Sequence, residues 1–131
     1  MAVKTVSYGN SKSYVGATSQ PLGDVLLVGP AANVSIKGIL VDTGADYLQV
    51  PAGAATTAGW SLSAGTLVSV GTAGGTTTMT LLPGVSVEIE GTSVIVDLLC
   101  HPSGSSKPLL GRSALRALKE VGFDLSDWLW A

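Results

Sequence analysis

Apolar and polar side chains alternate along much of this chain with a period of two residues, which is the pattern of half-buried β-strands. The alternation is clearest over residues 85–90 and continues in apolar, β-branched runs over residues 34–41 and 94–99. Shorter strands are expected at residues 24–28, 47–50, 66–70 and 76–81, with turns rich in Gly, Pro or Asn between them. Pro83 and Gly84 are expected to break the chain before the strand over residues 85–90. The pattern therefore predicts an all-β fold.

Helical spacing occurs in two short places. Pro51 and Gly59 bracket an Ala-rich segment, so a short helix can start and stop there. Residues 113–121 place Ala, Leu and Val at helical spacing, with Ser113 suited to the N-cap and Gly122 to the end. Residues 1–22 are expected to form an extended N-terminal arm, and residues 123–131 a tail with large apolar side chains.

One carboxylate stands where the strand over residues 34–41 ends, because Asp42 is followed at once by Thr43 and Gly44. Burying a carboxylate among apolar residues costs several kcal/mol unless hydrogen-bond donors or a shared proton compensate. Gly44 permits a tight turn, and Thr43 offers a hydroxyl. Asp42 is therefore a candidate acid or base. The alternative is that Asp42 only opens a turn by bonding its own backbone.

The run Ile39-Leu40-Val41-Asp42-Thr43-Gly44-Ala45-Asp46, followed later by Pro108-Leu109-Leu110-Gly111-Arg112 and a helical segment, resembles the retropepsin-like aspartic proteases, the family of the retroviral proteases. The resemblance implies a single retropepsin-like domain over residues 1–131, with the closed, barrel-like acid-protease fold. It implies a flap hairpin over residues 66–82, tipped by glycines, and one short C-terminal helix. The alternative for the glycine-rich tip is an ordinary hairpin turn.

The resemblance also implies roles for individual residues. The catalytic residues would be Asp42, Thr43 and Gly44. The substrate would lie against Ala45, Asp46, Val50, Gly74, Gly75, Leu109 and Leu110. The dimer would be braced by Thr43, Asp46, Arg112, Trp128 and Trp130, with Asp46 and Arg112 where the family places a carboxylate and a guanidinium that pair. The two tryptophans could instead dock on this chain's own core.

Aspartic protease chemistry requires two carboxylates that share one proton. Asp42 is the only Asp followed by Thr-Gly or Ser-Gly in the sequence. A two-fold homodimer would bring Asp42 against its own copy. The expected reaction is hydrolysis of a peptide or protein substrate by an activated water, with no metal and no other cofactor.

Composition excludes several other classes of function. The net charge of −2 and the scattered basic residues argue against nucleic-acid binding. No apolar run is long enough to span a membrane, no signal-peptide pattern begins the chain, and one cysteine allows no internal disulfide, so a cytoplasmic location is expected. Cys100 and His101 are neighbours, and neighbouring residues on a strand point to opposite faces, so a buried Cys and a loop His are expected. The glycines at residues 71–75 lack the Lys of a phosphate-binding loop.

Two alternatives to the active protease remain open. The first is a non-catalytic peptide-binding or assembly β-domain with the same fold. The second is a monomer or an inactive precursor that awaits self-cleavage in its N-terminal arm. Charged residues make up only 12% of the chain, and the apolar surface that this implies favours an oligomer.

Overall fold

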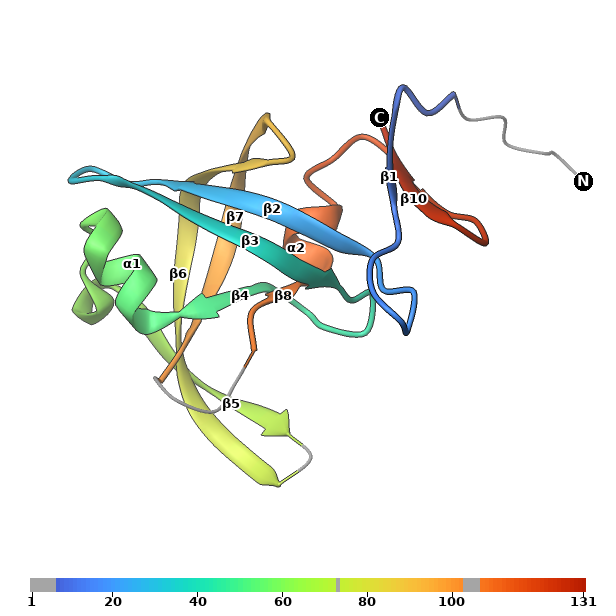
Figure 1. The fold of residues 1–131 in the computed structure, drawn as a ribbon. Coiled ribbons are helices and arrows are strands. Elements are labelled where there is room, and N and C mark those ends of the chain that lie inside the picture. The colour runs from blue at the N-terminus through green and yellow to red at the C-terminus, as the bar shows by residue number, and fades with distance from the viewer. Residues whose placement is uncertain (1–6, 73, 103–106) are drawn as a thin grey trace, which may run out of the picture.

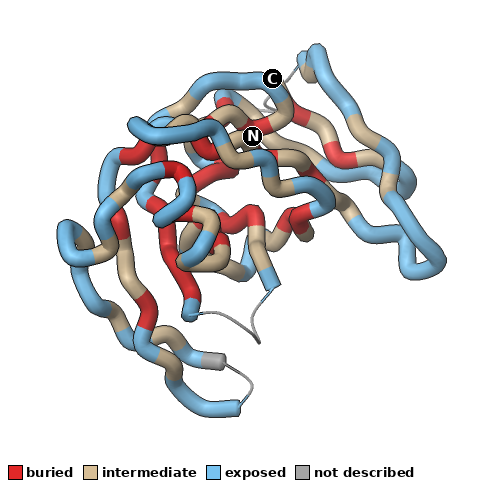
Figure 2. The backbone as a smooth tube through the Cα atoms, turned by 60° about the vertical axis from the view of Figure 1, so that its left-hand side comes forward, coloured by how far each residue is buried: buried red, intermediate tan, exposed pale blue. Residues whose placement is uncertain are grey.

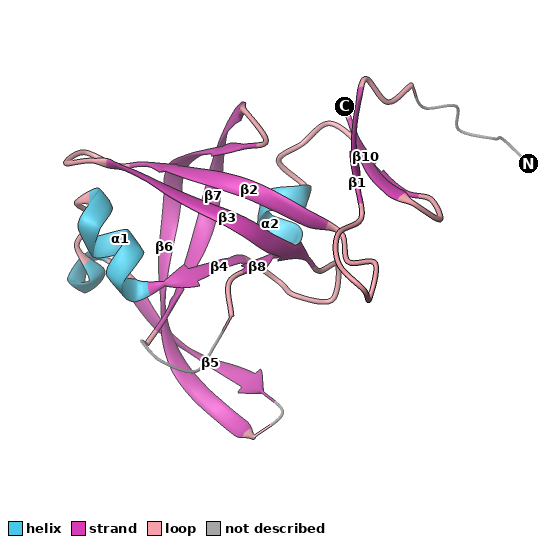
Figure 3. Cartoon of the chain, in the orientation of Figure 1, coloured by secondary structure: helices cyan, strands magenta, loops and turns pink. Residues whose placement is uncertain are grey.

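Strands make up most of the molecule, as Figures 1 and 3 show. The computed structural model describes residues 7–72, 74–102 and 107–131. The strands are β1 (Asn10–Ser13), β2 (Leu22–Val28), β3 (Asn33–Val41), β4 (Leu48–Pro51), β5 (Thr66–Thr72), β6 (Gly75–Ile89), β7 (Thr92–His101), β8 (Leu109–Leu110), β9 (Val121–Phe123) and β10 (Asp127–Trp130). The helical segments are α1 (Ala52–Ala58), the 3-10 segment η1 (Leu62–Ala64) and α2 (Arg112–Leu115). The predicted all-β class is confirmed.

The larger sheet closes on itself. Its seven strands follow the order β2-β3-β8-β4-β7-β6-β5, and β2 also pairs with β6. The β2–β6 pairing aligns Val25 with Ile89 and Leu27 with Val87. Because this pairing joins the first strand of the order to the sixth, the strands β2, β3, β8, β4, β7 and β6 form a largely closed barrel, as expected.

The barrel core follows from the alternation of side chains along the strands. In β2, residues Gly23, Val25 and Leu27 are buried, while their neighbours are only partly covered. The same alternation places Leu48, Leu98 and Leu110 in the core from three adjacent strands. Figure 2 shows the buried positions along the inside of the barrel and the exposed ones at its turns and edges.

Strand β6 does not end at Pro83 and Gly84, so the expected break is wrong. The pairing with β7 instead shifts register between Leu82 and Val85, which marks a β-bulge. Gly84 has a φ of 64°, and its N–H donates to an Asp97 carboxylate oxygen at 3.1 Å. A bulge accommodates a proline that lacks an N–H, so the strand continues to Ile89.

The hairpin expected over residues 66–82 is present. β5 and β6 pair antiparallel from Thr66 with Leu81 to Thr72 with Gly75. Figure 1 shows this hairpin extending away from the barrel at the lower edge of the molecule. Its far end is therefore held mainly by the pairing of its own two strands.

The two predicted helices have different outcomes. α1 begins after Pro51 and ends at Gly59, which has a φ of 102°, as expected. The helix expected over residues 113–121 is wrong in length, because α2 covers only Arg112–Leu115. Beyond α2, the N–H groups of Ala117 and Leu118 donate to carbonyls three residues back, not four as in an α-helix. The Lys119 N–H then donates to the Ala131 carbonyl at 3.1 Å. Tertiary pairing with the chain end thus draws residues 121–123 into a strand.

The N-terminal arm and the C-terminal tail form a second sheet in the order β1-β10-β9. Trp128 and Trp130 stack with ring centroids 4.2 Å apart, and Trp128 is completely buried. The Trp128 indole N–H donates to the Leu22 carbonyl at 3.1 Å. The tryptophans therefore dock on this chain's own core, which was the alternative left open, and their role in bracing a dimer stays a prediction. The part of the arm over residues 1–6 lies outside the described residues.

Candidate active site

The turn that follows β3 is held from below by β8. The Asp42 N–H donates to the Leu110 carbonyl at 3.1 Å, and the Gly44 N–H donates to an Asp42 carboxylate oxygen at 2.8 Å. The Asp42 carbonyl accepts the Ala45 N–H at 3.2 Å. Asp42 is partly exposed in the single chain, so its carboxylate is not sealed in the apolar core as the sequence suggested. The turn presents this carboxylate at the surface with one backbone donor already on it.

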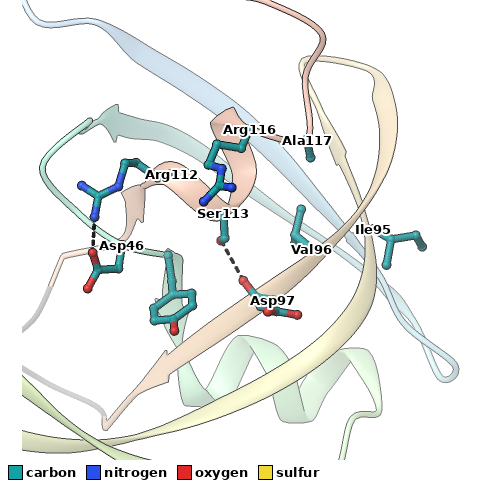
Figure 4. A pocket seen from close by; sticks show the side chains of 9 residues that line it. Asp46, Ile95, Val96, Asp97, Arg112, Ser113, Arg116 and Ala117 are labelled. Carbon is teal, nitrogen blue, oxygen red and sulfur yellow. Dashed lines mark hydrogen bonds and ion pairs between the residues drawn. The ribbon is translucent and has the colours of Figure 1, made fainter.

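Arg112 binds this turn from the start of α2. Its guanidinium donates to the Thr43 carbonyl at 2.7 Å and forms an ion pair with Asp46. The side chains of Arg112 and Asp46 are 45% and 71% exposed, so the ion pair itself adds little to stability. Its geometric effect is larger, because one rigid planar group fixes both ends of the turn. Figure 4 shows the pair, which the sequence anticipated.

Backbone contacts continue this bracing. The Arg112 N–H donates to the Ala45 carbonyl at 2.9 Å, and the Ser113 N–H donates to the Asp46 carbonyl at 3.0 Å. A Cβ on Gly111 would lie 2.3 Å from the Tyr47 carbonyl oxygen. Only glycine therefore allows α2 to approach the turn this closely.

Ser113 has a different role from the expected N-cap. The N-cap position of α2 is Gly111, which makes no side-chain cap. The Ser113 hydroxyl instead accepts the Leu48 N–H at 2.7 Å and donates to the Asp97 carbonyl at 2.8 Å. It therefore links β4 to β7 beneath the turn, as the dashed line in Figure 4 shows for its Asp97 contact.

A groove of about 670 Å³ lies between this turn and the β5–β6 hairpin. Its lining residues come from the turn, the hairpin, strands β4, β7 and β8, and the segment just before β8: Asp42, Gly44, Ala45, Asp46, Tyr47, Gln49, Val68, Ser69, Val70, Gly71, Met79, Leu99, Lys107 and Leu109. Most of the carbon-rich wall comes from Val68, Val70, Met79 and the leucines. The groove thus places Asp42 beside a lining of mixed apolar and polar residues.

The predicted substrate-contact residues divide into two groups. Ala45, Asp46 and Leu109 line the groove. Val50 and Leu110 do not, because both are completely buried in the core on the other face of their strands. Gln49 and Leu99 take their place, and Gln49 follows from alternation only once the structure shows that Leu48 faces the core.

The glycines expected at the tip of the hairpin lie beyond the groove. Gly74 and Gly75 are exposed, and a Cβ on either would meet no atom within 4 Å. The hairpin contributes residues from Val68 to Gly71 to the groove instead. Gly74 and Gly75 are therefore not among the described residues that line the groove in the single chain.

A second cavity of about 560 Å³ lies between α2 and β7, on the other side of the Asp46–Arg112 pair. Figure 4 shows Ile95, Asp97 and Arg116 around it. Asp46 and Tyr47 line both cavities. Asp46 and Tyr47 thus lie between the two cavities.

Cys100 and His101 take no part in the groove. Burial raises the pKa of the Cys100 thiol to about 11, so the thiol stays protonated. His101 is also buried at the end of β7, so the expected loop position is wrong, and its Nδ1 lies 3.1 Å from the Pro102 carbonyl oxygen. In the described part of the chain, no three His, Cys, Asp or Glu residues cluster as metal ligands would.

The described residues contain no helix that is long and apolar enough to cross a membrane. A family model described as gag-polyprotein putative aspartyl protease matches residues 33–117. The match begins at β3 and ends just after α2, so it includes the Asp42 turn, Arg112 and all residues that line the groove. No curated protein matches the chain.

Proposed function

Because the chain belongs to the gag-polyprotein putative aspartyl protease family, we propose that it is an aspartic endopeptidase that acts as a homodimer. The observation that carries this proposal is the position of Asp42, which lines a groove of about 670 Å³ between its own turn and the β5–β6 hairpin. The apolar side chains in the groove, among them Val68, Val70 and Met79, suit the side chains of an unfolded segment.

The second carboxylate must come from another copy. Asp42 and Asp46 are the acidic residues among those that line the groove, and Asp46 is engaged by Arg112. Asp46 is thus occupied by the guanidinium contact that braces the turn, and among the described residues the groove offers Asp42 no other acidic partner from this chain. A two-fold axis beside the exposed Asp42 turn would supply an identical Asp42 carboxylate.

In the proposed mechanism, the two Asp42 carboxylates share one proton and hold a water between them. The ionised carboxylate takes a proton from the water, whose oxygen attacks the peptide carbonyl carbon, while the other carboxyl donates its proton to the carbonyl oxygen. The C–N bond then breaks, and the nitrogen receives a proton from the dyad. The products are a free acid and a free amine.

The surrounding residues have supporting roles in this proposal. Thr43 and Gly44 shape the turn, and Arg112 acts as a positioning residue. The β5–β6 hairpin is the flap, which would cover the peptide and exclude water. Closure would bring Gly74 and Gly75 toward the substrate.

The first test compares the wild-type chain with Asp42→Asn in the cleavage of an unstructured protein from mildly acid to neutral pH. Asp97→Asn is the matched control, because it removes a charge outside the groove and keeps an oxygen for the Gly84 N–H. We expect cleavage by the wild type and the control, inhibition by a statine-type compound, and none with Asp42→Asn. A folded wild-type chain that binds peptides and cuts none would support the non-catalytic binding domain instead.

The dimer has its own test. Mixing Asp42→Asn with wild-type chain at constant total concentration should lower activity as the square of the wild-type fraction, since mixed dimers lack a complete dyad. A linear decrease would mean that each chain acts alone.

Arg112→Lys tests the positioning role. Lysine keeps the charge but cannot bond the Thr43 carbonyl and Asp46 with one planar group. We expect kcat to fall roughly 10- to 100-fold, as for small misplacements of catalytic groups, with little change in KM. Arg116→Lys is the control, and an equal fall in kcat in that variant would show that the effect is not specific to the turn.

A further inference from the structure

One polar residue interrupts an apolar row that crosses three strands. Gln49 in β4 is aligned with Leu109 in β8 and with Leu99 in β7. Aligned residues on neighbouring strands lie on the same face of a sheet, and all three line the groove that contains Asp42. On the opposite face, the adjacent row of Leu110, Leu48 and Leu98 is entirely apolar and buried. The groove floor thus has an amide where the other face of the same sheet has a leucine.

This amide is only weakly satisfied within the chain. Gln49 is 8% exposed, and its Nε2 donates to the Lys107 carbonyl at a long 3.3 Å. Among the described residues, the side chain makes no other hydrogen bond, so its carbonyl oxygen and one amide hydrogen remain for a ligand. A covered amide with a single long bond costs stability compared with leucine. Such a departure from the local pattern is typical of a functional position.

Lys107 adds a positive charge at the same place. Lys107 also lines the groove and is exposed, and its ammonium group forms no ion pair with any described residue. Of the groove-lining residues, Lys107 is the one with a basic side chain. The nearby walls, which include Val68, Val70 and Met79, can hold the methylene groups of a long side chain.

We propose that Gln49 and Lys107 form a specificity subsite for a glutamate side chain of the substrate. This inference rests on the proposed peptidase function and names its substrate class, a peptide with one glutamate among apolar residues near the cut bond. The Gln49 Nε2 donates to the glutamate carboxylate, the Lys107 ammonium balances its charge, and the apolar wall contacts its two methylene groups. Lys107 also offsets the repulsion between that carboxylate and the ionised Asp42.

The test uses peptides that differ at one residue, which is Glu, Gln or Leu at each position beside the cut bond in turn. At one position, the wild type should show kcat/KM in the order Glu, Gln, Leu, with about tenfold or more between the first and the last. Gln49→Leu should abolish the advantage of both polar residues over Leu. Lys107→Gln should abolish only the advantage of Glu over Gln.

Matched controls separate this effect from general damage. Gln20→Leu replaces an exposed glutamine in the N-terminal arm, and Arg116→Gln removes a positive charge outside the groove, so both should keep the wild-type order. Gln49→Glu supplies a second variant if Gln49→Leu does not fold, and it should disfavour the Glu peptide below the Gln peptide. A purely structural role for Gln49 would lower kcat/KM for all three peptides equally.

Two results would overturn the inference. One is a wild-type preference for Leu over Glu at every position, and the other is an unchanged Glu preference in both Gln49→Leu and Gln49→Glu. If no peptide is cut, the proposed function fails, and the affinities of the same peptides then test the subsite alone. The same order of affinities would support the subsite, and equal affinities would refute it.

Discussion

Replacing Trp128 with Phe tests whether the C-terminal tail is part of this chain's own core. The substitution removes the indole N–H that donates to the Leu22 carbonyl, at a cost of about 1 kcal/mol. It weakens the stacking on Trp130, worth about 1 kcal/mol. The smaller ring also leaves a void at a fully buried position, which costs about 1 kcal/mol more. We expect a total loss of about 3 kcal/mol, out of the 5–15 kcal/mol typical of folded proteins.

Urea unfolding followed by circular dichroism measures this loss. With an m-value of about 1.5 kcal/mol/M, the midpoint should fall by about 2 M. Leu125→Ala is the control, because Leu125 is completely exposed in the turn between β9 and β10 and should change stability by less than about 0.5 kcal/mol. Sedimentation should show the same self-association for the Trp128→Phe and wild-type chains.

Two outcomes would refute this reasoning. A midpoint shift under about 0.5 M would mean that the indole is not buried as described. Weaker self-association with an unchanged unfolding of the monomer would mean that the tail is a strand between subunits.

Three further predictions concern single positions. The Gly38 N–H, together with the charge of Lys12, holds the pKa of Asp24 below its usual value. The stability that ionised Asp24 contributes is therefore present above about pH 4 and is lost as pH falls through the lowered pKa. Asp24→Asn should make the free energy of unfolding depend less on pH in this acid range, and an unchanged pH dependence would contradict this. Cys100, with its pKa raised to about 11 by burial, should react with a thiol reagent at pH 8 only after denaturation, and rapid labelling of the folded chain would count against it. Gly111→Ala should lower the free energy of unfolding by about 1–3 kcal/mol, because the new Cβ would overlap the Tyr47 carbonyl. Gly53→Ala is the control and should be neutral or stabilising, because a Cβ there would meet open space. Similar urea midpoints for the two variants would disprove the close approach at Gly111.

The family resemblance predicted the Asp46–Arg112 pair. The residue pattern itself predicted most of the barrel strands, the hairpin over residues 66–82, the short helix after Pro51 and the Asp42 turn. These features depend on neighbouring residues or on a compact motif. Alternation with a period of two specifies a strand, and Pro and Gly at the two ends specify where a short helix begins and ends. The sequence also contained the reason to look for a second chain, since it has a single Asp-Thr-Gly.

The tertiary structure decided which face of each strand meets the groove. Alternation states that Gln49 and Val50 point to opposite sides, but only the pairing of β4 with β7 and β8 determines which of them lies in the core. Long-range pairing also turned the expected helix over residues 113–121 into α2 and β9, because β10 supplies hydrogen bonds to residues 121–123. The same sheet buried Trp128 within this chain. A local pattern contains no information about partners that are distant in sequence, and those partners decide what a side chain contacts.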